Sequence, residues 1–181
     1  IYNCPTGSTS TGSGFASGGT GLYQEQIFWL DWTCGATTNF PAGSTINKNW
    51  DAGDGLVITG QVTNITFAMT QYNTGGYSGD QLDNMYPGVN PIGLRGVTDG
   101  QDPQFRVVYT ATLNGASVPL NYVIGDAESS DNNESLSGVT NGTSWALLES
   151  QGVLTTTLAG NSFTMADNAG AGFGSAIVST T

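Results

Sequence analysis

The chain has 181 residues and a net charge of −11, and only three of its residues are lysine or arginine. Phosphate groups and anionic membrane surfaces both need a basic patch on their partner, so this composition excludes binding to nucleic acid and to an anionic membrane surface. No run approaches the ~20 apolar residues of a membrane span, so no membrane insertion is expected. Hydrophobic residues make up 38% and aromatic residues 10% of the chain, which is enough to form a core and excludes a disordered protein.

Residues 1–21 form a low-complexity segment rich in glycine and serine, with one cysteine at Cys4. The second cysteine of the chain is Cys34. In an extracellular protein the two would pair, and closing this loop would stabilise the fold by roughly 3–4 kcal/mol. Two free thiols are the alternative. We therefore expect an N-terminal segment pinned by a disulfide, followed by a single β-sandwich domain over residues 22–181.

The densest apolar run extends from Leu22 to Gly35 and contains two of the four tryptophans. With a period of two, Trp32 lies on one face and Trp29 on the other, so both faces carry a large apolar side chain. This pattern predicts a central strand that is covered on both sides. Its aromatic side chains are expected in the core, and contact of Trp29 or Asp31 with a ligand is the alternative.

Alternating apolar residues predict many further strands, which favours a sandwich or barrel. The alternation over residues 56–69 changes parity near Thr63-Asn64, which indicates a β-bulge or a turn at that point. Asp54-Gly55 and Asn114-Gly115 are tight-turn signals. Together the patterns predict an all-β, lectin-like or jelly-roll β-sandwich with one short helix. The expected strands cover residues 45–50, 56–69, 104–113, 118–124, 145–148, 153–158, 162–166 and 172–178.

Residues 70–103 show no strand period and are too long for a plain connection. Ser78 and Gln81 resemble a capping box, and Leu82, Met85 and Tyr86 would share one helix face, so a short helix is expected here. Long loops on a rigid sheet often carry function, which makes this segment the first candidate for a binding surface. The expected ligand-binding residues are Tyr72, Tyr77, Asp83, Tyr86 and Arg95.

Residues 124–135 crowd acidic side chains directly after a predicted strand. Calcium takes six to eight oxygen ligands, and a dense acidic loop can supply them. The alternative is that these side chains form Asx-turns and keep the loop soluble. The candidate calcium ligands are Asp126, Glu128, Asp131 and Glu134, with weaker candidates in the DAGD run at residues 51–54 and in the TDGQD run at residues 98–102.

The chain has no histidine, which excludes Ser-His-Asp and Cys-His catalysis and the usual zinc sites. A glycosidase needs a carboxylate pair, and nothing in the sequence singles one out, so we expect no enzyme. Lys48, the only lysine, is expected to be solvated, with a covalent bond to an Asn or Asp side chain as the alternative. Asn64, Asn133 and Asn141 match the glycosylation sequon.

Four stretches resemble one bacterial family: IFWLDWTCG (27–35), NKNWDAGDGLVIT (47–59), YNTGGYSGDQLDNMY with VNPIGL (72–94), and VIGDAESSDNNESLSGVTNGTSWALLES (123–150). They are similar to the non-repetitive adhesive domain of CshA-type fibrillar surface adhesins. The resemblance implies a lectin-like β-sandwich in a secreted or cell-surface adhesin, further adhesin modules in the full-length chain, and no catalysis. The implied partner is a glycan or glycoprotein of a host or neighbouring cell. The alternative is a structural subunit of a pilus or surface fibre assembled by strand addition.

Overall fold

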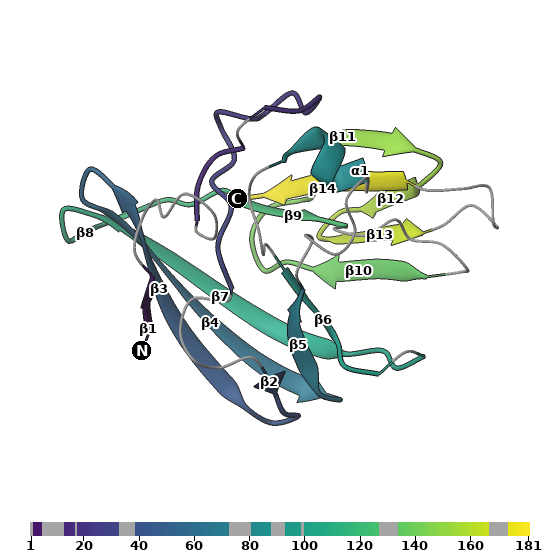
Figure 1. Ribbon diagram of the computed structural model, residues 1–181, viewed down its shortest axis with the longest axis horizontal. Coiled ribbons are helices and arrows are strands. Elements are labelled where there is room, and N and C mark those ends of the chain that lie inside the picture. Colours follow the sequence, from purple (N-terminus) through teal and green to yellow (C-terminus); the bar gives the residue numbers. More distant parts are fainter. Residues whose placement is uncertain are drawn as a thin grey trace. The chain divides into compact units, whose positions relative to one another are not determined.

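The computed structural model describes residues 2–4, 13–16, 18–32, 39–72, 81–87, 93–98, 100–126, 134–166 and 174–181. These residues form an all-β sandwich fold with one short helix, as predicted (Figure 1). The elements are β1 (Tyr2–Cys4), β2 (Asn39–Phe40), β3 (Thr45–Gly53), β4 (Leu56–Thr66), β5 (Met69–Tyr72), α1 (Gln81–Met85), β6 (Gly93–Gly96), β7 (Gln104–Leu113), β8 (Ala116–Val118), β9 (Tyr122–Gly125), β10 (Ser135–Val139), β11 (Ala146–Gly152), β12 (Thr155–Ala159), β13 (Ser162–Ala166) and β14 (Gly174–Thr180).

The chain divides into two compact units. Unit 1 comprises Ile1–Phe15, Phe28–Gly75 and Val89–Leu120, and unit 2 comprises Ala16–Ile27, Gly76–Gly88 and Asn121–Thr181. Each unit contains two sheets and its own buried cluster. The single domain expected over residues 22–181 requires that both units unfold together, and it stays a prediction.

Unit 1 contains a five-stranded sheet in the order β1-β3-β4-β7-β8 and a three-stranded sheet in the order β2-β5-β6. All of these strand pairs are antiparallel except β1 and β3, which are parallel. Side chains at every second position of a strand share one face, and Trp50 of β3 and Ile58 and Val62 of β4 all lie on the inner face of the sheet. Phe40 of β2 and Met69 of β5 complete the same core from the second sheet.

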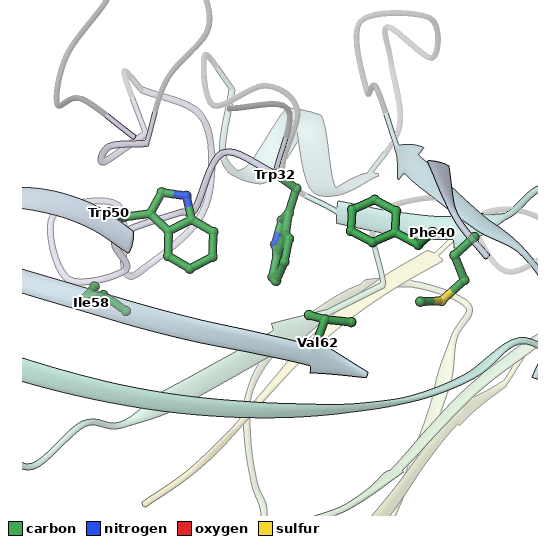
Figure 2. Packing of buried hydrophobic residues seen from close by; sticks show 6 residues of the cluster. Trp32, Phe40, Trp50, Ile58 and Val62 are labelled. Carbon is green, nitrogen blue, oxygen red and sulfur yellow. The ribbon is translucent and has the colours of Figure 1, made fainter. Parts of the chain in front are cut away.

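Aromatic rings dominate the core of unit 1, and Figure 2 shows Trp32 between Trp50 and Phe40, above Ile58 and Val62. The rings of Trp32 and Trp50 meet edge to face with centroids 5.1 Å apart. Gly60 of β4 makes room for this packing, because a Cβ at Gly60 would lie 2.7 Å from the Trp50 ring. Any side chain at Gly60 would therefore displace that ring.

Unit 2 contains two three-stranded antiparallel sheets, in the orders β10-β13-β12 and β11-β14-β9. Its core joins Phe163 and Met165 of β13 to Ala176 and Val178 of β14, with Trp145 beside them. The ring of Trp145 packs edge to face against Phe163 at 4.7 Å. Helix α1 belongs to this unit, and its Leu82 and Met85 are buried.

Residues 22–32, the described part of the run from Leu22 to Gly35, do not form the central strand that the pattern predicts. Residues 22–26 form turns, and Trp29 makes only an isolated bridge to Gly14. Burial on both faces is confirmed, because Trp29 and Trp32 are both buried. Two backbone hydrogen bonds join Trp29 to Gly14, and side chains bind the residues that follow. Trp50 Nε1 donates to the Asp31 carbonyl at 2.8 Å, and Lys48 Nζ donates to the Trp32 carbonyl.

The two predicted tight turns, Asp54-Gly55 and Asn114-Gly115, are confirmed, because all four residues have positive φ. Asn114 and Gly115 have φ values of 51° and 83°, as the predicted Asn-Gly turn between β7 and β8 requires. The bulge expected near Thr63-Asn64 lies one residue later, between Asn64 and Thr66. The strand expected over residues 118–124 is wrong, because it divides at Pro119, which has no N–H to donate to a ladder.

Candidate functional site

Tyr86 does not lie on an open binding surface. Its side chain is 1% exposed, and its hydroxyl donates to Glu149 Oε2 at 2.7 Å. Burial and this hydrogen bond raise the pKa of Tyr86 well above its usual range. The stacking role expected for Tyr86 does not fit this placement, because helix α1 packs as part of the core of unit 2.

The other expected ligand-binding residues remain predictions. Arg95 is exposed on β6, where a partner can reach it. Tyr72 belongs to β5 and Asp83 to α1, but their side chains lie outside the described part of the structure, as does all of Tyr77.

The acidic loop after β9 is described only at its two ends. Asp126 is partly buried, and its N–H donates to the Ala176 carbonyl at 3.1 Å; Glu134 is exposed just before β10. Glu128 and Asp131 lie outside the described residues. Among the residues that the structure describes, no three His, Cys, Asp or Glu side chains gather into a metal-binding group. Calcium binding therefore stays a prediction.

The weaker calcium candidate at residues 51–54 forms a turn of the kind that the alternative interpretation describes. Asp51 Oδ1 accepts a hydrogen bond from the Gly53 N–H at 2.9 Å, which is an Asx-turn. The disulfide also stays a prediction, because Cys34 lies outside the described residues and only the backbone of Cys4 is placed, opposite Trp50 in the parallel pair.

Lys48 is not the solvated lysine that the sequence predicts. Its side chain is 0% exposed, its Nζ lies 6.0 Å from the centroid of the Trp32 ring, and it donates to the Trp32 carbonyl. Burial lowers the pKa of Lys48 to about 8, and the nearby Asp31 carboxylate opposes this shift. Lys48 thus anchors the segment before Thr33 to the inner face of the sheet.

The turn between β4 and β5, which we call the Phe67 turn (residues 65–68), is the most unusual surface feature of unit 1. Phe67 has a φ of 53°, in the left-handed region that bulky residues avoid. Such a conformation costs about 1–2 kcal/mol for a residue with a side chain. It persists because the buried Asn64 side chain holds it: Nδ2 donates to the Phe67 carbonyl at 2.6 Å and to the Phe40 carbonyl at 2.7 Å.

Burial of the Asn64 amide also bears on whether the sequon at Asn64 can be glycosylated. Asn64 is 1% exposed, and its Nδ2 already donates to two carbonyls. An N-linked glycan requires a free, accessible amide nitrogen, so the folded protein offers no acceptor at this position. Asn141, in contrast, is exposed.

Three apolar side chains are exposed at the Phe67 turn and beside it: Ile65 (56%), Phe67 (45%) and Val97 (51%). The Val97 N–H donates to the Ala68 carbonyl at 3.1 Å, so the segment after β6 lies directly beside the turn. Figure 1 shows the β4–β5 turn and the β6–β7 connection at the same end of unit 1. Exposed apolar residues that gather on a rigid scaffold are typical of an interaction site.

The sequence pattern predicts the irregularity at this turn but not the exposure of its apolar side chains. The parity change near Thr63-Asn64 predicts a bulge or turn, and Ile65 and Phe67 belong to the apolar alternation that follows it. The available signal was Asn64 itself, because a polar side chain inside an apolar alternation must find buried hydrogen-bond partners. Its partners are the carbonyl of Phe40 in β2 and the carbonyl of Phe67 in the turn.

Comparison with known proteins gives one family match, which covers residues 25–181 and is described as surface adhesin CshA non-repetitive domain 2. The chain belongs to this family. The resemblance of the four sequence stretches is thereby confirmed, and the match extends over most of both units. No curated protein and no solved structure matches the chain.

Membership of a surface adhesin family implies a place at the cell surface or outside the cell. In the part of the chain that the structure describes, no helix is both long and apolar enough to cross a membrane.

Proposed function

We propose that this chain is a ligand-binding domain of a surface adhesin, and that it recognises a glycan or a matrix glycoprotein on a host or neighbouring cell without catalysis. The observation that carries the proposal is the family match over residues 25–181. The Phe67 turn supports it, because its apolar side chains are exposed on a rigid sheet and contribute nothing to the core.

The first experiment is binding of the purified chain to a panel of glycans and matrix glycoproteins, in calcium and again in EDTA. Saturable binding in both conditions supports an adhesin whose site needs no metal. Binding that EDTA abolishes supports the calcium loop, and Asp126→Asn should then abolish it as well. Absence of binding to every member of the panel contradicts the proposal.

One observation favours the second candidate, a structural subunit of a surface fibre. The edge of the five-stranded sheet is occupied by β1, a three-residue strand that pairs in parallel with Lys48–Trp50 of β3. A strand this short at an edge could be supplied by a neighbouring chain, as in strand addition. Filaments whose length depends on protein concentration, and which disappear when residues 1–12 are deleted, would support this candidate.

A further inference from the structure

Residues 18–24, which we call the strap, belong to unit 2 but lie outside the family match, which begins at residue 25. Three successive backbone N–H groups of the strap donate to acceptors of unit 2. They are Thr20 to the Asn84 carbonyl at 3.0 Å, Gly21 to the Met85 carbonyl at 2.9 Å, and Leu22 to Glu149 Oε2 at 3.0 Å. The matched fold therefore carries a row of acceptors that a segment from outside the match occupies.

The strap covers the aromatic ring of Tyr86. A Cβ atom at Gly21 would lie 2.4 Å from Cζ and 2.6 Å from Cε1 of that ring, so only glycine lets the backbone lie this close. Gly21 is buried and Tyr86 beneath it is 1% exposed, whereas Leu22 is 74% exposed. The backbone of one glycine thus closes off the hydroxyl end of the ring.

The strap is held more weakly than the strands of unit 2. Within residues 18–22 Gly21 alone is buried, and it has no side chain to pack. The bond from Leu22 to Glu149 is exposed, and so is the bond from Gln151 Nε2 to Thr20 Oγ1 at 2.8 Å. Segments with few buried apolar contacts and exposed hydrogen bonds open at low free energy. We therefore expect the strap to open while the sheets stay folded.

The groups beneath the strap suit a neutral sugar. They are an aromatic ring, a carboxylate, an amide side chain and two backbone carbonyls, which belong to Tyr86, Glu149, Gln151, Asn84 and Met85. Sugar hydroxyls are donors that can replace the N–H groups of the strap at these acceptors, and the C–H face of a sugar ring can pack on an aromatic ring. Glu149 and the net charge of −11 repel an acidic sugar, which favours a neutral one.

We propose that the strap is an autoinhibitory cover over a glycan-binding site of unit 2, where Tyr86 stacks on a neutral sugar ring and Glu149 and Gln151 bind its hydroxyls. The strap and the sugar compete for the same acceptors, so the sugar binds only when the strap is open. The apparent Kd is then the intrinsic Kd divided by the open fraction, and a minor state typically holds about 0.1–10% of the molecules. This inference rests on the proposed adhesin function and selects a neutral glycan as the ligand.

Hydrogen exchange of the full chain tests whether the strap opens by itself. We expect the amides of Thr20, Gly21 and Leu22 to exchange at least about a hundredfold faster than those of β14, which pairs with a strand on each side. Exchange of these three amides at the rate of the β14 amides shows that the strap opens only when unit 2 unfolds, and it overturns the inference.

Binding to the neutral and the sialylated members of the glycan panel tests the cover. Gly21→Ala should open the strap, because the added Cβ meets the Tyr86 ring and lies 2.8 Å from the Met85 carbonyl oxygen. We expect it to bind neutral glycans at least about tenfold more tightly than the parent, with sialylated glycans bound more weakly. Gly14→Ala is the matched control, because its Cβ meets nothing within 4 Å, and it should bind as the parent does.

Gln24→Ala is a second way to loosen the strap, without adding atoms against the core. Gln24 Nε2 donates to the carbonyls of Gly19 at 2.7 Å and Gly21 at 3.0 Å, which holds the strap in shape. We expect its affinity for neutral glycans to rise about threefold. Affinity that is unchanged or lower in both strap variants, with β14 exchange as slow as in the parent, overturns the cover.

A substitution in the site itself completes the test. Gln151→Ala in the Gly21→Ala background removes an amide that binds the sugar when the strap is already open, and it should lose at least about threefold in affinity. Unchanged affinity for neutral glycans in this double variant places their binding elsewhere and overturns the proposed site.

Matrix glycoproteins, native and deglycosylated, distinguish failure of this inference from failure of the proposed function. Binding that survives deglycosylation, with no neutral glycan bound by either strap variant, overturns the covered glycan site but keeps the adhesin. Absence of binding to every glycan and glycoprotein, in the parent and in both strap variants, overturns both.

Discussion

The two units hold the irregular N-terminal part of the chain by opposite polar chemistry. In unit 1, the cationic Lys48 and the indole N–H of Trp50 donate to backbone carbonyls of Asp31 and Trp32. In unit 2, the Glu149 carboxylate accepts hydrogen bonds from the Leu22 N–H at 3.0 Å and from the Tyr86 hydroxyl at 2.7 Å. One anchor is a buried donor and the other an acceptor, so they should respond differently to substitution and to pH.

The comparison shows how a segment without a strand ladder becomes part of a fold. Its backbone groups still need hydrogen-bond partners, and long side chains from the sheets supply them. At each anchor, one or two side-chain atoms make the hydrogen bonds that hold several residues of the segment. Single substitutions at the anchors should therefore cost far more than substitutions elsewhere on the same strands.

The largest effect is expected at the anchor of unit 1. Lys48→Met keeps most of the side-chain volume but removes the charge and the donor, leaving the Trp32 carbonyl and the buried Asp31 without this partner. Breaking a buried pair typically costs about 3–5 kcal/mol, and urea unfolding would measure the loss. Arg106→Met, an exposed cation on β7 of the same unit, should change stability by less than about 0.5 kcal/mol. Equal effects of the two substitutions would contradict the anchor.

A smaller effect is expected in unit 2. Leu22 and Tyr86 both donate to the same carboxylate oxygen, Glu149 Oε2, and Glu149→Gln replaces that charged acceptor by a neutral amide oxygen, which accepts weaker hydrogen bonds. We expect a loss of about 1–2 kcal/mol in the same urea experiment. The control is Glu25→Gln, an exposed carboxylate in the attached segment, which should change stability little. The anchor in unit 2 is wrong if Glu25→Gln costs as much.

The lowered pKa of Lys48 should make the free energy of unfolding of unit 1 depend on pH. The pKa of Lys48 is lowered to about 8 from an ordinary value of 10.5, so between these values the unfolded state holds a proton that the folded state has released. The free energy of unfolding should therefore rise by about 1–2 kcal/mol from pH 8 to pH 10. This rise should be absent in Lys48→Met. A flat profile in the parent would instead indicate that Lys48 is covalently bonded, with a mass lower by one water molecule for a bond to Asp or by one ammonia molecule for a bond to Asn.

Tyrosines should reverse this trend at higher pH. Burial raises the pKa of Tyr122 to about 12 from 10.0, so the unfolded state loses the hydroxyl proton first. A group with a raised pKa contributes stability that is lost as pH increases past its unfolded value. The stability of the parent should therefore pass through a maximum near pH 10, and Tyr122→Phe should weaken the decline above it.

The sequence predicted most strands because their signals are local. The alternation in residues 104–113 and the Asn-Gly turn after it match β7 and the turn to β8. The run from Leu22 to Gly35 misled the prediction, because an apolar period of two reports burial on two sides and not the origin of the hydrogen bonds. Residues elsewhere in the chain decide that. They are Ser13 and Gly14 before the run and Lys48 and Trp50 after it, and no local pattern contains them.

The candidate site was harder to predict for the same reason. Tyr86 looks like a binding residue because it lies in a tyrosine-rich segment, but it is buried and donates to Glu149, which lies far along the chain. Conversely, Phe67 belongs to an apolar alternation, yet it is exposed in the turn that the Asn64 side chain holds. In both cases a hydrogen bond to a residue outside the local pattern decides whether the aromatic side chain is buried or exposed.

The smallest expected effect concerns coupling between the two anchors. Lys48 and Glu149 belong to different units and bond to different partners, so their substitutions should add, with an interaction energy below about 0.5 kcal/mol in the double variant Lys48→Met with Glu149→Gln. Calorimetry of the same variants tests the single domain expected over residues 22–181. If both units unfold together, each variant shifts one common transition. If they unfold separately, Lys48→Met shifts only one of two transitions and Glu149→Gln only the other, because each anchor then stabilises its own unit alone.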